Sequence, residues 1–226
     1  MKRSGLVVLL AVLAATAGWG SYQAVANWKS QRSVTASESP RREDNRENRV
    51  AIDSAVRLLQ SGDLVLRTGA DAISVMLRQM NLRDKTYSHC GIVMVENGYP
   101  FIYHSIGGED NPDERLRRDS ASFFFSPVYN ERLGVARFQI DTAQIGQLQQ
   151  IVRRYYQARV PFDMDFDLGT DDRLYCAEFV YKAVQEATSD TAYFGKSSVL
   201  AKTYVGVDNL TDARHARIIC DVRYKL

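Results

Sequence analysis

Cysteine and histidine are both scarce in this sequence, with three residues of each among 226. The sequence therefore gives little support to a dense disulfide framework or to a zinc site built from cysteine and histidine. An excess of charge of one sign is also lacking, since 29 basic residues stand against 27 acidic residues and leave a formal charge of +2. This balance gives no electrostatic basis for binding nucleic acid. A hydrophobic content of 45% is instead typical of a globular chain.

The first residues have the pattern of an export signal. Lys2 and Arg3 precede an uncharged apolar run over 5–20, which contains the small-residue pattern Ala15-Thr16-Ala17. These features correspond to the basic, hydrophobic and cleavage regions of a secretory signal. Because the chain stays uncharged to residue 28, the segment approaches the length of a membrane-spanning helix. We therefore predict a signal peptide or N-terminal membrane anchor over 1–28, with export to the periplasm or cell envelope and membrane association through residues 5–28 if the segment is retained.

A polar segment then leads into one domain. Residues 29–49 are almost wholly polar, with interleaved charges, and predict a solvated linker, whose end could merge into the helix that follows. The remainder, 50–226, is long enough for a single domain with its own core. The hydrophobic periodicity predicts helices over 50–59, 70–80, 142–156, 177–187 and 197–202, and strands over 63–67, 134–140 and 216–222. Residues 107–126 are polar and turn-rich apart from Phe123-Phe124-Phe125, and predict an irregular surface segment.

The clearest local signal is Asn97-Gly98, which stands between two apolar runs. Asn-Gly is the strongest short-range signature of a two-residue β-hairpin. In the register that this turn sets, Gly91 lies opposite His104, so that His89, Gly91 and His104 project from the same sheet face. The two imidazoles then become diagonal neighbours, roughly 7–8 Å apart at the backbone. Gly91 leaves a gap beside His104 because it has no side chain.

Cys176 stands at the start of an apolar, helix-prone run. The partial positive charge and free N–H groups of a helix N-terminus favour a thiolate there. Such a thiolate is a candidate nucleophile, and His89 and His104 could serve it, one taking its proton and the other fixing the tautomer. The alternative is a buried, inert cysteine with two structural histidines. His215 has no partner in this pattern and is predicted on the surface.

Four short motifs follow one another in an order found in a known family. They are Ser61-Gly62-Asp63-Leu64, Ser88-His89-Cys90-Gly91-Ile92-Val93, Tyr103-His104 and Tyr175-Cys176-Ala177-Glu178-Phe179-Val180. In this order the chain resembles the circularly permuted papain-like hydrolases of the YaeF/YiiX-type branch of the NlpC superfamily, which is related to the lecithin:retinol acyltransferase-like proteins. The resemblance implies an α+β domain over 50–226, in which an antiparallel sheet packs against helices and the nucleophilic cysteine begins a helix.

The resemblance also implies a role for individual residues. Cys176 would be the nucleophile, His89 the general base and His104 the third, polar member of the catalytic group. The segment 161–163, which includes Asp163, would line part of the cleft, and a tyrosine directly before the cysteine, here Tyr175, fits this branch. No cofactor or metal ion is expected.

The remaining requirement of acyl transfer is a site for the oxyanion. The Cys176 N–H, at the start of a helix, is a natural donor to it. Tyr87 and Ser88, which stand beside His89, are candidates for the second donor.

The expected function is that of an exported thiol hydrolase. It would cleave an amide or ester bond through a Cys-His-His acyl-enzyme mechanism, with a small peptide of the cell envelope as substrate. The first alternative is a lipid acyl hydrolase or acyltransferase, which the acyltransferase relatives and the possible anchor suggest. The second alternative is a non-catalytic module that keeps the cleft and binds without turnover.

Five aspartates close to Cys176 invite a calcium site, but their spacing does not fit one. Counted from Asp163, the EF-hand positions that require glycine and glutamate hold Leu168 and Leu174. Apolar residues alternate with the aspartates over 162–168, which favours a half-buried extended segment.

Cys90 follows His89 and is therefore predicted to point to the opposite sheet face, away from the cleft. Cys90 could pair with Cys220 in an oxidising compartment, leaving Cys176 free. Buried free thiols explain both cysteines equally well.

Overall fold

The computed structural model describes residues 42–108, 111–200 and 202–226. The predicted signal or anchor over 1–28 and the linker up to residue 41 lie outside these residues. Residues 42–225 form one compact unit. The helical elements are η1 (Arg42–Asp44), α2 (Arg46–Leu58), α3 (Ala72–Arg78), α4 (Ala121–Phe124), α5 (Thr142–Gln157), α6 (Cys176–Thr188) and α7 (Val207–Leu210). The strands are β1 (Leu64–Gly69), β2 (His89–Glu96), β3 (Tyr99–His104), β4 (Arg117–Ser120), β5 (Asn130–Phe138), β6 (Ser197–Val199), β7 (Lys202–Tyr204) and β8 (Ala216–Arg223).

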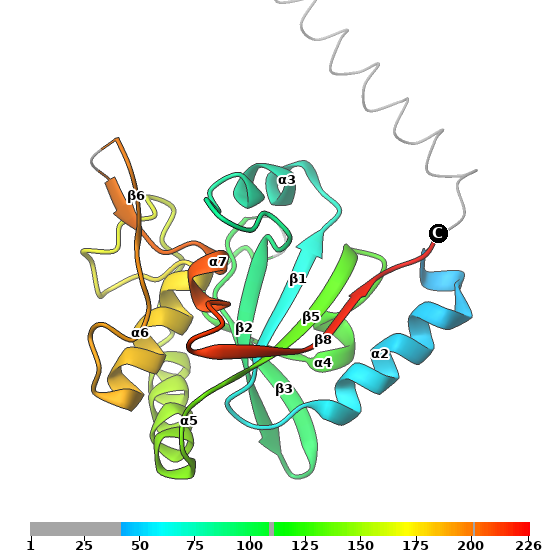
Figure 1. The fold of residues 1–226 in the computed structure, drawn as a ribbon, viewed down its shortest axis with the longest axis horizontal. Coiled ribbons are helices and arrows are strands. Elements are labelled where there is room, and N and C mark those ends of the chain that lie inside the picture. The colour runs from blue at the N-terminus through cyan, green and yellow to red at the C-terminus, as the bar shows by residue number, and fades with distance from the viewer. Residues whose placement is uncertain (1–41, 109–110, 201) are drawn as a thin grey trace, which may run out of the picture. The chain divides into compact units, whose positions relative to one another are not determined.

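The centre of the fold is a six-stranded antiparallel sheet in the order β4-β3-β2-β1-β5-β8. Helices α5 and α6 lie on one side of this sheet and α2 on the other (Figure 1). The predicted α+β class, with an antiparallel sheet against helices, is therefore confirmed. Strands β6 and β7 form a separate two-stranded ribbon. Among the described residues, no helix has both the length and the apolar character needed to span a bilayer.

Strand alternation divides the buried side chains into two cores. Leu66 and Cys90 belong to the core that contains α5 and α6, whereas Val65 and Val93 belong to the core beneath α2 and α4. Successive side chains of β1 and β2 thus serve opposite faces, as the twofold period of a strand requires. Both strands are buried on both faces because helices cover each side of the sheet.

The hairpin predicted at Asn97-Gly98 is confirmed. Strands β2 and β3 pair with Glu96 opposite Tyr99 and Ile92 opposite Tyr103, in the register that a two-residue turn sets. Asn97 and Gly98 have φ values of 51° and 84°. A type I′ turn requires positive φ at both central residues, and asparagine and glycine adopt it at the least cost.

Gly91 in β2 is packed closely against β3. A Cβ atom added there would lie 2.8 Å from the Tyr103 carbonyl oxygen, 2.8 Å from Ile102 Cγ2 and 3.0 Å from His104 Cβ. The gap predicted beside His104 is therefore absent, because β3 packs against Gly91 and fills the space that a side chain would need.

Substitution Gly91→Ala is expected to lower the free energy of unfolding by about 1–3 kcal/mol, because a backbone carbonyl cannot move aside without disturbing the sheet. Urea denaturation measures the change. Gly146→Ala is the matched control, since a Cβ atom at Gly146 in α5 meets nothing within 4 Å. Alanine is also the better helix former there. Equal stability of the two variants would contradict the tight packing at Gly91.

The start of the domain differs from the prediction. The last part of the predicted linker is helical, because α2 begins at Arg46 and Asn45 caps it by accepting the Glu47 N–H at 2.9 Å. The apolar residues of the predicted helix over 50–59 are only partly buried, since Val50 and Leu58 are exposed. Helix α3 is shorter than the predicted segment 70–80 and contains no buried residue.

Two further predictions of local structure are wrong. The segment 107–126 is not irregular throughout, because it contains β4, which pairs with the edge of β3, and the short helix α4. The polar character of residues 117–120 reflects an edge strand rather than a loop. The segment 197–202, predicted as a helix, instead contributes to the ribbon of β6 and β7. Val199 is β-branched and suits a strand better than a helix.

The segment 162–168 is not an extended strand. Asp163 is fully buried, and its carboxylate accepts the N–H groups of Asp165 and Asp167 at 2.9 and 2.6 Å. Phe166 has a φ of 52°, a left-handed conformation that no strand contains. The alternating pattern of phenylalanine and aspartate therefore belongs to a folded loop held around one carboxylate.

Candidate active site

Cys176 is the first residue of α6, directly after a well-satisfied helix start. The Glu178 carboxylate turns back to accept the Tyr175 N–H at 3.2 Å, and the Phe179 N–H donates to the Tyr175 carbonyl at 2.9 Å. The cysteine side chain is 7% exposed. Its sulfur accepts hydrogen bonds from the Ala177 N–H, in the first turn of α6, and from the Cys90 N–H in β2.

The pKa of Cys176 is lowered from its ordinary value. The largest cause is the hydrogen bond from the Cys90 thiol. The two backbone N–H groups and the positive charge of Arg67 also lower the pKa, and together these effects outweigh burial, which raises it. Each of these groups stabilises negative charge on the sulfur. The environment of Cys176 thus favours a nucleophilic thiolate.

The two histidines predicted on one sheet face are in direct contact. His89 begins β2 and His104 ends β3, and His89 Nε2 lies 2.9 Å from His104 Nδ1. Their rings meet edge to face, with centroids 5.0 Å apart. The hairpin register therefore places the two imidazoles as expected.

Asp119 completes this group and was missed by sequence reasoning. It lies in β4 opposite Ile102, and its Oδ2 is 3.0 Å from His104 Nε2. The other carboxylate oxygen accepts a hydrogen bond from the Arg117 guanidinium at 2.9 Å. Burial alone would raise the pKa of Asp119, but hydrogen bonds and charge from His104 and Arg117 outweigh it and lower the pKa. Asp119 is therefore a carboxylate at neutral pH.

The hydrogen bonds that link Asp119 to His104 and His104 to His89 determine which nitrogen of each ring carries the proton. A carboxylate only accepts, so His104 Nε2 must carry the proton that points to Asp119. His104 Nδ1 is then an acceptor, and His89 Nε2 must donate to it. In neutral His89 this leaves Nδ1 with a lone pair. The chain Asp119–His104–His89 thus prepares one imidazole nitrogen as a proton acceptor.

Both imidazoles are neutral at neutral pH because they are buried. Burial lowers the pKa of His89 well below 6.5, and the positive charge of Arg67 lowers it further. Burial lowers the pKa of His104 from 6.5 to about 4, although the hydrogen bond to Asp119 raises it. The ring of Phe124 in α4 packs on both histidines, with centroids 5.8 Å from His89 and 5.2 Å from His104. One member of the Phe123-Phe124-Phe125 cluster therefore packs directly against both imidazoles.

Arg67 in β1 is a second contributor that the sequence pattern did not reveal. It lies opposite His89 in the sheet, and its guanidinium carbon is 4.9 Å from the centre of the Phe124 ring. Its charge lowers the pKa of His89, His104 and Cys176 alike. A single cation thus disfavours the imidazolium and favours the thiolate.

Arg67→Met is expected to slow alkylation of Cys176 at neutral pH by no more than about tenfold, the change that one pKa unit produces. Methionine keeps an apolar stem against Phe124 while removing the charge. The rate is measured with iodoacetamide, by mass spectrometry of the Cys176 peptide. Arg46→Met, at an exposed position in α2, is the matched control. An unchanged alkylation rate in Arg67→Met would show that its charge does not act on the sulfur.

The predicted contact between Cys176 and His89 is indirect in this structure. His89 and Cys90 point to opposite faces of β2, and α6 packs on the face of Cys90. The Cys176 sulfur lies at the Cys90 N–H, one peptide unit from His89, and no hydrogen bond joins the sulfur to the His89 ring within the described residues. Catalytic hydrogen bonds are often long in structures without substrate.

The four other predicted site residues have structural partners. The Tyr87 hydroxyl donates to Asp221 at 2.8 Å, and the Ser88 hydroxyl accepts the Gly69 N–H at 3.0 Å. The Tyr175 hydroxyl accepts the Val205 N–H at 2.9 Å, and Asp163 holds the loop before α6 as described above. All four are buried. Each of the four side chains therefore has a hydrogen-bond partner within the protein, and their predicted contact with a substrate or an oxyanion stays a prediction.

The predicted orientation of Cys90 is half right. Its side chain does point to the sheet face opposite His89, but that face carries α6, so Cys90 contacts Cys176 and does not point away from it. A Cys90–Cys220 disulfide does not fit. Cys220 in β8 is three strands from β2, roughly 14 Å at usual strand spacing, and packs toward the other core. A disulfide needs Cα atoms within about 7 Å.

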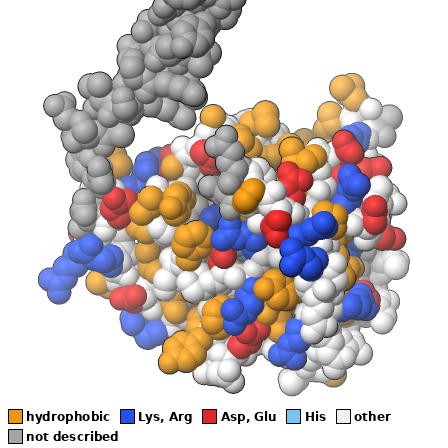
Figure 2. All heavy atoms as spheres, turned by 180° about the vertical axis from the view of Figure 1, so that it is seen from behind, with side chains coloured by type: hydrophobic (Ala, Val, Ile, Leu, Met, Phe, Trp, Pro, Cys, Tyr) orange, Lys and Arg blue, Asp and Glu red, His pale blue; other side chains and the backbone are white. Residues whose placement is uncertain are grey.

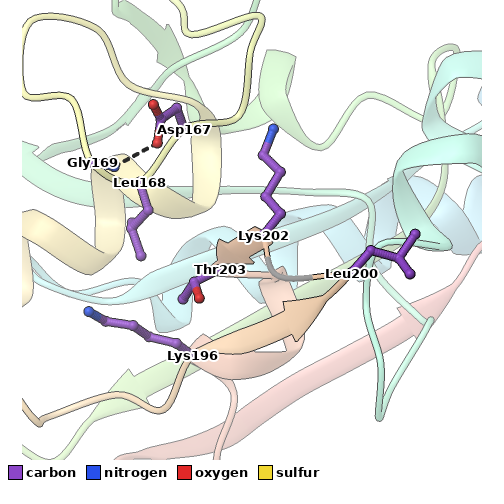
Figure 3. A pocket seen from close by; sticks show the side chains of 7 residues that line it. All are labelled: Asp167, Leu168, Gly169, Lys196, Leu200, Lys202 and Thr203. Carbon is purple, nitrogen blue, oxygen red and sulfur yellow. Dashed lines mark hydrogen bonds between the residues drawn. The ribbon is translucent and has the colours of Figure 1, made fainter.

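A cleft of about 590 Å³ lies beside the loop that leads to α6 (Figure 3). Its lining residues are Asp167, Leu168, Gly169, Lys196, Leu200, Lys202 and Thr203. The Lys202 ammonium donates to the Asp165 carbonyl at 2.5 Å and ties β7 to this loop. Neither Cys176 nor the two histidines line this cleft. Figure 2 shows acidic and basic side chains interspersed with hydrophobic ones over one face of the molecule, without a field of one sign.

Comparison with known proteins finds a relative by sequence and a solved structure of similar fold. No family model matches the chain. It is 25% identical over 130 residues to an uncharacterized protein, YiiX of Escherichia coli strain K12, and the match spans 57% of this chain and 58% of that protein. The crystal structure of a protein described as the metalloprotein YiiX, from Escherichia coli O157:H7, superimposes with a TM-score of 0.60 at 20% identity, covering 73% of this chain and 98% of that one. The sequence match and the shared fold together show that the chain is a homologue of YiiX.

Proposed function

We propose that this protein is a thiol hydrolase that cleaves an amide bond through an acyl-enzyme on Cys176. The observation that carries the proposal is the hydrogen-bonded chain Asp119–His104–His89, which leaves His89 Nδ1 as an acceptor. The pKa of Cys176 is lowered, and its sulfur accepts the N–H of Cys90, the residue after His89. A nucleophile, a base and an orienting group on that base are the parts that acyl transfer needs. An inert buried cysteine would require neither the lowered pKa nor the ordered imidazoles.

The proposed reaction begins with transfer of the Cys176 proton to His89 Nδ1. Substrate binding would bring the sulfur and this nitrogen within hydrogen-bond distance. The thiolate attacks the carbonyl carbon, and the Cys176 N–H in the first turn of α6 stabilises the oxyanion. The His89 imidazolium then gives its proton to the leaving amine. Water, deprotonated by His89, attacks the thioester, which releases the acid and restores the thiol.

The order of the motifs supports assigning the fold to the permuted papain-like group. The hairpin that carries His89 and His104 precedes the helix that carries Cys176, which is the order of the YaeF/YiiX-type branch that the sequence resembles. With the predicted signal or anchor over 1–28, this resemblance supports an exported protein in the periplasm or cell envelope. A small peptide of the envelope is then the proposed substrate.

An acyl lipid is the second candidate substrate, and a surface feature favours it. Helix α3 follows β1 at the end that carries Arg67, and it exposes Ile73 and Met76 at 63% each. Apolar side chains on an exposed helix suit contact with acyl chains. The same thiolate chemistry would then act on an ester.

A metal ion has no assigned place in this mechanism. The word metalloprotein describes the YiiX crystal structure and not this chain. Within the described residues, no three histidine, cysteine, aspartate or glutamate side chains converge as metal ligands do. The proposed reaction uses the side chains of Cys176, His89, His104 and Asp119.

The proposal is tested by offering the purified chain a panel of peptide amides and acyl esters. Hydrolysis of one class is expected, with loss of activity in Cys176→Ala and retention in Cys220→Ala, which removes a cysteine far from the site. Preference for amides or for esters decides between the two substrate classes. Turnover that survives Cys176→Ala would overturn the proposal, and tight binding without turnover would favour a binding module.

A further inference from the structure

The two buried thiols Cys90 and Cys176 face each other across the interface between β2 and α6. Both belong to the hydrophobic core on that side of the sheet, where Cys90 is fully buried and Cys176 is 7% exposed. The Cys90 thiol is hydrogen-bonded to the Cys176 sulfur, and the Cys90 N–H donates to the same sulfur. Both cysteines are reduced in this structure. The thiols are thus held together by the strand and the helix that carry them.

The two thiols differ in acidity. Hydrogen bonds lower the pKa of Cys176, whereas burial and the neighbouring Cys176 sulfur raise the pKa of Cys90 well above its ordinary value. Cys176 therefore reacts first with an electrophile, while Cys90 remains a protonated neighbour. This arrangement matches a redox-sensitive cysteine with a resolving cysteine beside it.

No other described cysteine competes for this partnership. Cys220 lies in β8, separated from β2 by β1 and β5, and faces the core beneath α2. At usual strand spacing its Cα lies roughly 14 Å from that of Cys90. Of the three described cysteines, Cys90 and Cys176 are therefore the two that the fold places beside each other.

We propose that Cys90 and Cys176 form an oxidation site, in which a peroxide converts the pair into an intramolecular disulfide that blocks the Cys176 nucleophile. The Cys176 thiolate attacks one oxygen of hydrogen peroxide, the O–O bond breaks, and the departing hydroxide takes up a proton as water. Cys90 then attacks the sulfur of the resulting sulfenic acid. The S–S bond forms, the S–O bond breaks, and the hydroxide that leaves takes the Cys90 proton as a second water. Two thiols lose two electrons in total, and the peroxide gains them.

The disulfide would protect the site from irreversible damage. A sulfenic acid without a resolving thiol proceeds to sulfinic acid, which ordinary thiol reductants do not reverse. A disulfide returns to two thiols by exchange with a reductant. The regulatory meaning of this site rests on the proposed function of Cys176, whereas formation of the disulfide does not.

The experiment treats the full chain with hydrogen peroxide and follows the product by intact mass and peptide mapping. The expected product has lost two hydrogen atoms, links the peptides of Cys90 and Cys176, leaves one thiol, and returns to three thiols with dithiothreitol. In Cys90→Ala, and in Cys90→Ser as a second variant, Cys176 is expected to gain two oxygen atoms irreversibly. Products are compared at equal loss of the Cys176 thiol, because removing Cys90 also changes the rate of the first step.

Cys220→Ala is the matched control and is expected to form the same disulfide as the unchanged chain. A disulfide to Cys220, or irreversible oxidation of Cys176 to the same extent with and without Cys90, would overturn the inference. Because the readout is mass and not turnover, a chain that forms the disulfide but hydrolyses nothing would contradict the proposed function alone. A chain that hydrolyses substrate but never forms the disulfide would contradict this inference alone.

Discussion

Replacement of Asp119 by asparagine is expected to lower kcat/KM for hydrolysis by roughly 10²- to 10⁴-fold, with little change in stability. The reason lies in the direction of the protons. Asp119 can only accept, which forces His104 to donate through Nε2 and His89 to donate through its own Nε2. An asparagine side chain can donate to His104 Nε2. Both rings can then reverse, which places a proton on His89 Nδ1 and removes the base that Cys176 needs.

The measurement separates this effect from a loss of structure. Asp119→Asn is expected to lower kcat with little change in KM, and to slow alkylation of Cys176 at neutral pH. Asp53→Asn, which changes an exposed carboxylate in α2, is the matched control and should behave as the unchanged chain. Thermal unfolding of both variants shows whether they fold equally well. An Asp119→Asn variant with full kcat would mean that the carboxylate does not set the tautomers.

The hairpin shows which part of this site could be read from the sequence. Asn97-Gly98 sets a two-residue turn, and strand alternation then determines that His89 and His104 share a face. These are local effects within sixteen consecutive residues. Asp119 depends instead on β4, a short polar edge strand without apolar alternation, so no periodic signal marked it. The ladder between β3 and β4 places it, and a single sequence does not show that pairing.

Cys90 marks a second limit. Alternation along β2 correctly separates Cys90 from His89, but it gives only relative faces. Which face α6 covers depends on how the chain crosses the sheet between β5 and β8, a long-range feature that the local pattern does not contain. The error over 162–168 has another origin. The carboxylate of the fully buried Asp163 accepts the N–H groups of Asp165 and Asp167 and so holds a loop, in which apolar residues and aspartates alternate as they would in a strand. Short polar side chains that bond to nearby backbone compete in this way with regular structure.

The free energy of unfolding is expected to fall by about 3 kcal/mol through His104 alone as the pH is lowered from 6.5 to about 4. The folded chain holds the pKa of His104 at about 4, whereas the unfolded chain takes up a proton near 6.5. Between these values the unfolded state binds more protons, so stability is full above 6.5 and decreases as the pH falls. His89, whose pKa is also lowered by burial, adds to the loss in the same direction.

Urea denaturation at a series of pH values tests this, with the unchanged chain compared to His104→Gln. Glutamine can donate to Asp119 and accept from His89, so it preserves the hydrogen bonds but does not titrate. The unchanged chain should therefore lose its stability advantage over His104→Gln between pH 6.5 and about 4. His215→Gln, which removes the third histidine and leaves the pair intact, should keep the acid-dependent loss. Parallel curves for the unchanged chain and His104→Gln would show that burial does not lower the pKa of His104.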